Sequence, residues 1–301
     1  MLSKAGVFME IKKLLFVTKF EGLCYDALRS LLVLRKADLE HVVFLNVIER
    51  DKVAMKRGAG YLKEEEVKLK ETANIRFIDW AENLFEMGME VGAYIEVSTL
   101  IPEILKVIEK ESPDLIVIGR SHKSTLEQLY SGSDVNELVR RTRIPILVFK
   151  HMAEDKIVPE KLFERLLFAT NWSETVVRMV EYIKSMKNVI GEIHVIHVVK
   201  DSALKSPDAH AVQKVRKSER KRLDDLCDEL EEQGIKARAH LYVGDPQKEI
   251  EKAAREYQAS MIVLGSSDKA AIIERWGGSI SRHMSDNSIF PCLIIPGKKE
   301  T

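Results

Sequence analysis

The feature that most constrains the fold of this 301-residue chain is an internal repeat. Gly119 and Gly132-Ser133 are followed, 146 positions later, by Gly265 and Gly278-Ser279. Three other pairs of segments recur in the same order, at offsets of 152, 151 and 146 residues. Since the order is kept and only a few loop residues are lost, we infer a tandem duplication of a unit of about 140 residues.

Each unit alternates short apolar runs with helical patterns. In the second unit, Val176, Met179 and Ile183 follow the spacing of one helix face. Apolar strands that alternate with helices are typical of a parallel sheet covered on both faces. We therefore predict two α/β domains, each a doubly wound, five-stranded parallel sheet. In the second unit we expect strands at 166–170, 193–199, 237–243, 261–264 and 292–295, with a long charged helix at 207–232.

A polar segment, 151–164, separates the two units. The expected organisation is a first domain at 1–150, a linker at 151–164 and a second domain at 165–301. The charged run 63–71 is interpreted as a solvated helix face.

Charge and composition exclude several classes of partner. Lys+Arg and Asp+Glu both number 47, so the composition gives no indication of a basic surface that would bind nucleic acid or a membrane. No apolar run approaches the roughly 20 residues that span a bilayer, and we expect no signal peptide. The three cysteines lack metal or disulfide spacing, so we expect a protein of the reducing cytosol.

The glycines and serines of the repeat are candidate ligand contacts. A helix that starts at Gly132-Ser133 or Gly278-Ser279 offers unpaired N–H groups and a hydroxyl to an anion. The same residue types are favoured there for helix stability alone. Gly119 and Gly265 either admit a ligand close to the backbone or simply end a strand. Both interpretations stay open from the residues.

Taken together, the motifs resemble the universal stress protein family. They comprise a fourth strand that ends in glycine, a Gly-Ser helix start, a proline-led last strand, and the turns Gly244-Asp245-Pro246 and 170–174. The similarity covers about 12–150 and 164–298. It implies an adenine nucleotide alpha hydrolase-like fold of strand order 3-2-1-4-5, with ATP or AMP over the carboxyl ends of strands 1 and 4. Related single domains pair through their last strands, so the resemblance also implies that 146–149 and 293–295 meet in an internal pseudo-dimer.

Neither half carries the full motif of the ATP-binding members. Their second glycine is replaced by His122 in the first half and by Asp268 in the second. Their acidic residue after strand 1 is replaced by Lys19 and by Asn171. A carboxylate at Asp268 would repel a phosphate nearby unless a cation lay between them.

The resemblance predicts an adenine-nucleotide site, with or without Mg²⁺, in at least one half, and a sensor or regulator rather than a dedicated enzyme. Without a water-activating base beside a metal, any hydrolysis of ATP would be slow. The alternatives are a scaffold that has lost nucleotide binding and a slow ATPase, and association of two chains into a homodimer is left open. The predicted contacts are Thr170, Asn171, Val198, Gly244, Gly265, Ser266, Gly278 and Ser279 in the second half, and Gly119, Arg120, Gly132 and Ser133 in the first.

Overall fold

The first half of the chain forms a five-stranded α/β unit. The computed structural model describes residues 10–20, 24–53, 62–120, 132–150, 161–200, 209–266 and 280–297. The elements of the first half are β1 (Lys13–Val17), α1 (Tyr25–Leu31), the 3-10 helix η1 (Leu32–Ala37), β2 (His41–Glu49), α2 (Arg50–Val53), α3 (Lys63–Glu86), β3 (Glu90–Ser98), α4 (Leu100–Glu111), β4 (Leu115–Arg120), α5 (Gly132–Arg141) and β5 (Ile146–Lys150).

The second half repeats this order, as the internal repeat predicts. Its elements are β6 (Arg165–Thr170), α6 (Thr175–Ser185), β7 (Glu192–Val199), α7 (Ala209–Glu231), β8 (Ala237–Val243), α8 (Pro246–Glu256), β9 (Met261–Ser266), α10 (Ile280–Asn287) and β10 (Cys292–Pro296). None of the described helices has the length and apolar character that crossing a membrane requires.

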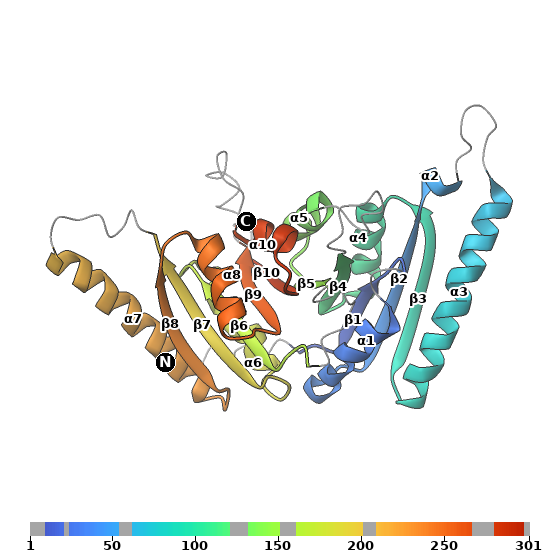
Figure 1. Cartoon of the computed structure of the whole chain (residues 1–301). Helices are drawn as coiled ribbons and strands as arrows, with labels where there is room; N and C mark the ends of the chain where they lie inside the picture. The colour runs from blue at the N-terminus through green and yellow to red at the C-terminus, as the bar shows by residue number, and fades with distance from the viewer. Residues whose placement is uncertain are drawn as a thin grey trace, which may run out of the picture.

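All ten strands belong to one continuous sheet of order β3-β2-β1-β4-β5-β10-β9-β6-β7-β8. Pairing is parallel within each half, so the predicted α/β fold and the predicted strand order are confirmed. The halves join where β5 and β10 pair antiparallel, with Leu147 opposite Leu293. The expected meeting of the two last strands is therefore confirmed, and Figure 1 shows the two units side by side across this junction.

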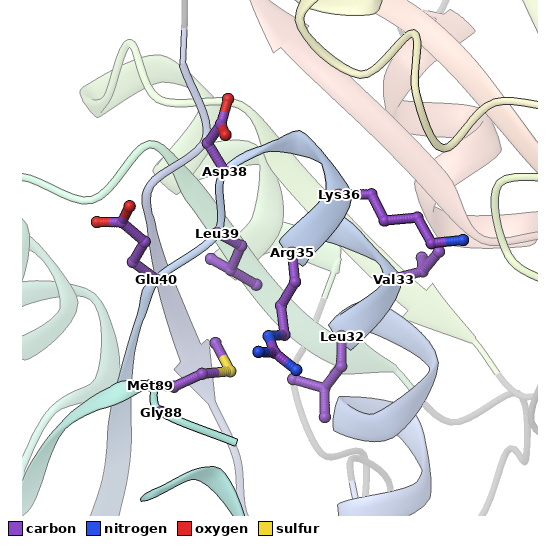
Figure 2. A pocket seen from close by; sticks show the side chains of 9 residues that line it. All are labelled: Leu32, Val33, Arg35, Lys36, Asp38, Leu39, Glu40, Gly88 and Met89. Atoms are coloured by element: carbon purple, nitrogen blue, oxygen red, sulfur yellow. The ribbon is translucent and has the colours of Figure 1, made fainter.

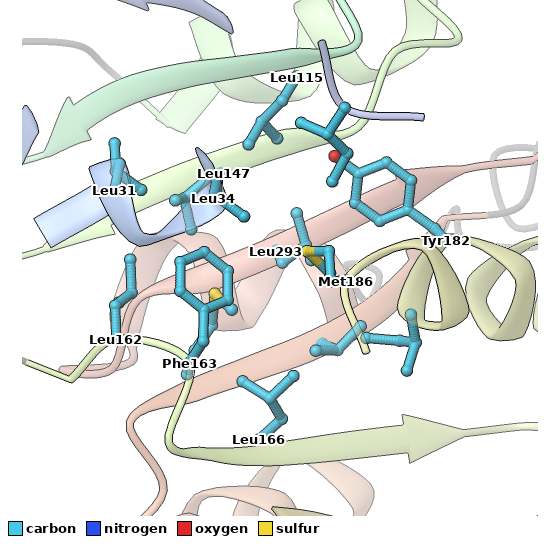
Figure 3. Packing of buried hydrophobic residues seen from close by; sticks show 14 of the residues in the cluster. Leu31, Leu34, Leu115, Leu147, Leu162, Phe163, Leu166, Tyr182, Met186 and Leu293 are labelled. Atoms are coloured by element: carbon cyan, nitrogen blue, oxygen red, sulfur yellow. The ribbon is translucent and has the colours of Figure 1, made fainter. Parts of the chain in front are cut away.

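Each face of the sheet carries its own apolar core. On one face the strands pack against α1, α3, α6 and α7, and on the other against α4, α5, α8 and α10. The first core runs across the junction, where Phe163 and Leu162 from the segment before β6 lie among Leu31, Leu147 and Leu293 (Figure 3). Burial on both faces explains why the strands are apolar throughout rather than alternating.

Hydrogen bonds from two side chains also connect the halves across the junction. The ammonium of Lys150, at the end of β5, is buried and donates to the carbonyls of Met284 and Ser288 at the end of α10, at 2.7 and 2.6 Å. In the other direction, the Arg178 guanidinium of α6 donates to the carbonyl of Arg143 in the first half and, within its own half, to that of Pro296 at 2.8 Å. A cation at a helix carboxyl terminus satisfies carbonyls that have no helical partner. Each half therefore depends on the other for hydrogen bonds.

A pair of histidines lies beneath α8 on the outer strands of the second half. Nδ1 of His194 and Nε2 of His240 are 3.0 Å apart, and the Tyr257 ring stacks on both, with ring centroids 4.5 and 4.2 Å away. Burial lowers the pKa of His194. Burial, with the neighbouring His194, lowers the pKa of His240 to about 4. Both rings are therefore neutral in the folded protein at pH 7.

This pair predicts a loss of stability in mild acid. Between about pH 6.5 and 4, His240 and His194 bind protons in the unfolded chain but stay neutral in the folded protein. The free energy of unfolding therefore falls as pH falls through this window. We expect a contribution of about 1–2 kcal/mol, reduced from the full shift because the rings are not fully buried. Urea unfolding at several pH values measures it.

The variant His240→Gln should flatten this pH dependence. His210→Gln, which changes an exposed histidine of α7, is the matched control and should leave the dependence as in the wild type. An unchanged pH profile in His240→Gln would contradict the assignment.

Candidate functional site at the carboxyl edge of the sheet

The strand order places a switch point at the carboxyl edge of each half. In the first half β1 pairs with β2 on one side and β4 on the other, and in the second half β6 pairs likewise with β7 and β9. Connections leave the two sides in opposite directions, so a crevice for ligands forms there in doubly wound sheets. The described residues that follow these strands are the candidates for a site.

The loop after the first strand is built in the same way in both halves. The Thr18 hydroxyl accepts from the N–H of Phe20 at 2.8 Å, and the Thr170 hydroxyl accepts from the N–H of Trp172 at 3.1 Å. The next strand supplies a side-chain donor to each threonine carbonyl: Asn46 to Thr18 at 2.8 Å, and Nδ1 of His197 to Thr170 at 2.9 Å. An asparagine in one half and a histidine in the other thus bind the equivalent threonine carbonyl. Thr170 therefore has a structural role in addition to any ligand contact.

Each of these loops contains an aromatic residue in a left-handed conformation. Phe20 has φ of 68° and Trp172 has φ of 58°. Arg76 of α3 lies over the Phe20 ring at 5.0 Å, and Arg222 of α7 over the Trp172 ring at 4.3 Å. Such cation–π contacts and packing offset the cost of left-handed backbone in a bulky residue.

The second half adds a polar cluster that the sequence analysis missed. The Trp172 indole donates to Glu219 of α7 at 2.6 Å, and Nε2 of His197 lies 3.6 Å from the same carboxylate oxygen. In the repeat, Glu219 corresponds to Ala73 of α3, so the first half has no carboxylate at this position. The pairing of Glu219 with Trp172 joins residues 47 apart and has no signal in sequence spacing.

Asn171 and Lys19 occupy equivalent positions but differ in their partners. The Asn171 side chain is exposed, and its oxygen accepts from the N–H of Ser173 at 3.1 Å. It therefore stabilises its own turn rather than capping α6, whose N-cap is Glu174. The Lys19 ammonium instead forms an ion pair with Glu49 at the end of β2.

Gly265 and Ser266 lie inside β9, where a turn was expected. The strand continues through Ser266, which pairs with Pro296. A Cβ on Gly265 would stand 2.8 Å from the Met179 sulfur and 3.0 Å from a Thr175 methyl group of α6. The missing side chain thus lets α6 pack onto β9, a reason that the sequence analysis did not consider. Gly119 likewise lies within β4, paired with Phe149.

Gly244 and Val198 lie at the carboxyl ends of β8 and β7, on the side of α8. Gly244 has φ of 145°, a conformation that favours glycine, and its N–H donates to the carbonyl of Val199 at 3.0 Å. Asp245 then caps α8 by accepting from the N–H of Lys248 at 3.1 Å. Val198 is half-buried against the core on this face. The Gly-Asp-Pro turn therefore starts α8, as expected.

The predicted phosphate-binding helix starts are described only in part. α5 begins at Gly132, with Ser133 in its first turn, as predicted. Arg120 is the last residue of β4. Gly278 and Ser279, which precede α10, lie outside the described residues. His122 and Asp268 do too.

A cavity of about 460 Å³ lies at the opposite edge of the sheet, where η1 meets the starts of β2 and β3. Figure 2 shows Arg35 directed toward the turn at Gly88 and Met89, and its guanidinium donates to the Met87 carbonyl at 2.8 Å. Basic and acidic side chains both line the cavity, so its charge does not favour a phosphate. It is separate from the carboxyl edge. Within the described ranges, no three His, Cys, Asp or Glu side chains are grouped so that they could hold a metal ion.

Comparison with known proteins identifies the family of this two-half sheet. The model of the universal stress protein family matches residues 10–150 and, a second time, residues 162–296. The chain belongs to the universal stress protein family. Its tandem arrangement follows from the two matches.

Relatives with one unit and with two are both found. A universal stress protein of Methanocaldococcus jannaschii is 23% identical over 157 residues, which are 46% of this chain and 97% of the relative. One of Bacillus subtilis is 24% identical over 147 residues, 44% of this chain and 99% of the relative. The crystal structure of a universal stress protein from Archaeoglobus fulgidus covers 96% of this chain and 97% of its own, with a TM-score of 0.68 and 22% identity. That likeness shows the fold of both halves.

The contact between α6 and β9 predicts the effect of a methyl group at Gly265. Gly265→Ala should lower the free energy of unfolding by about 1–3 kcal/mol, because the new Cβ overpacks the contact with Met179 and Thr175. Gly92→Ala in β3 is the matched control: its Cβ would meet its neighbours only at 3.6 Å or more, so we expect a change within about 0.5 kcal/mol. Urea unfolding measures both. Equal effects of the two substitutions would show that close packing is not what requires Gly265.

Proposed function

We propose that this universal stress protein binds an adenine nucleotide, ATP or AMP, at the carboxyl edge of its second half. We propose further that it acts as a sensor or regulator. The observation that carries the proposal is the switch point between β6 and β9, beside which Asn171 is exposed; Val198 and Gly244 lie at the carboxyl ends of the neighbouring strands β7 and β8. Family membership supports the choice of ligand class.

The first half is the weaker candidate because of its charges. Lys19 stands where the second half has Asn171, and its ammonium is engaged by Glu49 at the ends of β1 and β2. A ligand entering there would have to displace or accommodate this ion pair, which costs desolvation of two charges. Asn171 offers amide groups to a base or ribose at no such cost.

In the proposed complex, this chain supplies shape and a few directed polar groups. The Asn171 amide and the main chain near Val198 would contact the base and ribose, while Gly244 leaves room beside them. The phosphates would lie toward Gly278 and Ser279, before α10, where N–H groups of a helix start favour anions.

A scaffold without nucleotide is the second candidate, and specific observations favour it. Gly265, Gly244 and Asn171 each already serve the fold: Gly265 lets α6 pack on β9, Gly244 turns the chain and donates to Val199, and Asn171 holds its own turn. We also propose that the protein works in the cytosol, since its described cysteines are free thiols. Because β5 and β10 pair within the chain, a homodimer would have to use another surface.

Isothermal titration calorimetry with ATP and with AMP, each with and without Mg²⁺, tests the proposed function. We expect one nucleotide per chain. Asn171→Ala should weaken binding about tenfold, as expected for a lost hydrogen bond and a loosened turn. The matched variant Lys19→Ala, at the equivalent position of the first half, should leave the affinity unchanged.

Two results would overturn this proposal. Absence of heat with either nucleotide, together with absence of nucleotide released from the denatured protein, would favour the scaffold. Weakening by Lys19→Ala but not by Asn171→Ala would move the site to the first half.

A further inference from the structure

The outer face of α3 carries an apolar stripe that the fold does not need. Of the six large hydrophobic residues that are exposed in the described part of the chain, five lie on α3 or at its end. The four on the helix are Val67, Ile75, Ile78 and Phe85, with 47%, 67%, 50% and 57% of their surface exposed. Isolated exposed apolar residues are ordinary, but a concentration of them on one element marks an interaction surface.

The spacing of these residues places three of them on one side of the helix, with the exposed Asn74 near the same line between Val67 and Ile78. At about 100° per residue, Val67, Ile78 and Phe85 fall within about 20° of one line along the helix, and Ile75 lies about 60° to one side. The buried residues of α3, among them Phe77 and Leu84, face the sheet. Figure 1 shows α3 at the outer end of its half, beside β3. The stripe therefore faces away from the core.

The duplicated half provides an internal comparison. α7 is the counterpart of α3, and Arg222 lies over Trp172 as Arg76 lies over Phe20, which fixes the offset at 146 residues. At that offset the stripe of α3 corresponds entirely to polar residues: Gln213, Lys221, Asp224 and Glu231. The same helix in the same fold is thus stable without an apolar outer face. The stripe is a property of α3 alone.

The size of the stripe suits one helix rather than a globular surface. From Val67 to Phe85 it is about 27 Å long and one helix, about 10 Å, wide. This area of roughly 270 Å² is well below the ~800 Å² that each partner contributes to a stable interface of standard size. A second copy of the chain would leave most of such an interface unformed. A single helix packed along α3 fills the stripe.

The charges beside the stripe indicate which charged residues the partner helix would carry. Glu71 and Glu82 project between Ile78 and Ile75, both are exposed, and neither forms an ion pair within the described residues. On the other side Lys70 is already paired with Glu66 at 2.8 Å. Lys63 and Lys68, in the first two turns of α3, are also exposed, so charges of both signs lie near Val67. From Glu71 onward, the exposed charges beside Ile75, Ile78 and Phe85 are negative.

We propose that α3 is a docking surface for an amphipathic helix of another protein, whose apolar face is flanked by Lys or Arg. The apolar side chains of the two helices pack along the stripe, and the basic residues of the partner pair with Glu71 and Glu82. This surface lies on the first half and does not depend on nucleotide binding at the second.

Two synthetic helical peptides test the proposal on the full chain. Both carry leucines at helical-face spacing; one has lysines and the other glutamates beside them. In fluorescence anisotropy we expect the lysine peptide to bind at least about tenfold more tightly than the glutamate peptide, and less tightly as salt is raised. The triple variant Ile75→Lys, Ile78→Asp, Phe85→Glu, which takes the residues of α7, should lose at least about tenfold in affinity.

The controls separate apolar contact from charge. The triple variant makes α3 more negative by one charge, so a lysine peptide held by charge alone would bind it more tightly. Glu71→Gln with Glu82→Gln should weaken binding and reduce its salt dependence. Val177→Lys, which changes the remaining exposed hydrophobic residue, on α6, should bind like the wild type.

Three outcomes would overturn the proposal. They are equal affinity for the two peptides, binding that the triple variant leaves unchanged, and no binding of either peptide. Sedimentation of the free protein gives a further check: a dimer that the triple variant dissociates would assign the stripe to a second copy of the chain instead. Circular dichroism confirms that each variant is folded.

Discussion

The antiparallel pairing of β5 with β10 is the interaction on which the rest of the structure depends. It turns two five-stranded sheets into one sheet of ten strands and removes the two edges that would otherwise present unpaired backbone groups. Around it, Leu162 and Phe163 complete a core that spans both halves. Lys150 donates to the Met284 carbonyl and Arg178 to the Arg143 carbonyl, each in the opposite half. The junction is therefore apolar on both faces of the sheet, and the Lys150 and Arg178 side chains add hydrogen bonds between the halves. It behaves as the interior of one protein rather than as a contact between two domains.

Comparison of the halves separates what the fold requires from what was free to change. Both keep a threonine hydroxyl that closes the loop after the first strand and an aromatic residue beneath an arginine. The residue between them has diverged, to Lys19 with its ion pair in one half and to the exposed Asn171 in the other. The residues that hold the backbone of this loop are thus alike in the two halves, whereas the residue at the position proposed for ligand contact differs. The outer faces of α3 and α7 diverged in the same way, which fits different partners for the two halves.

Much of this fold could be predicted from the sequence, because hydrophobic periodicity and an internal repeat both survive in the primary structure. The strand order and the pairing of the last strands came from the family resemblance, and both are confirmed. The site was predicted less well. The packing reason for Gly265 depends on Met179, 86 positions earlier, and the ion pair of Lys19 depends on where β2 ends. The charged start of α3 indicated a solvated helix face, and no local pattern indicated that Ile75 and Phe85 are exposed on it. Contacts between distant residues, not local patterns, decide these points.

The central claim is that the two halves form one cooperative unit, and urea unfolding followed at one tryptophan in each half tests it most directly. Trp80 reports on the first half and Trp172 on the second, in variants in which the other tryptophans are replaced by phenylalanine. The shared core and the crossing hydrogen bonds predict that, for each variant, the tryptophan transition coincides with loss of helix by circular dichroism, as two-state unfolding requires. A variant whose tryptophan signal is lost while half of the helix remains would show that the halves unfold separately, and would contradict the account.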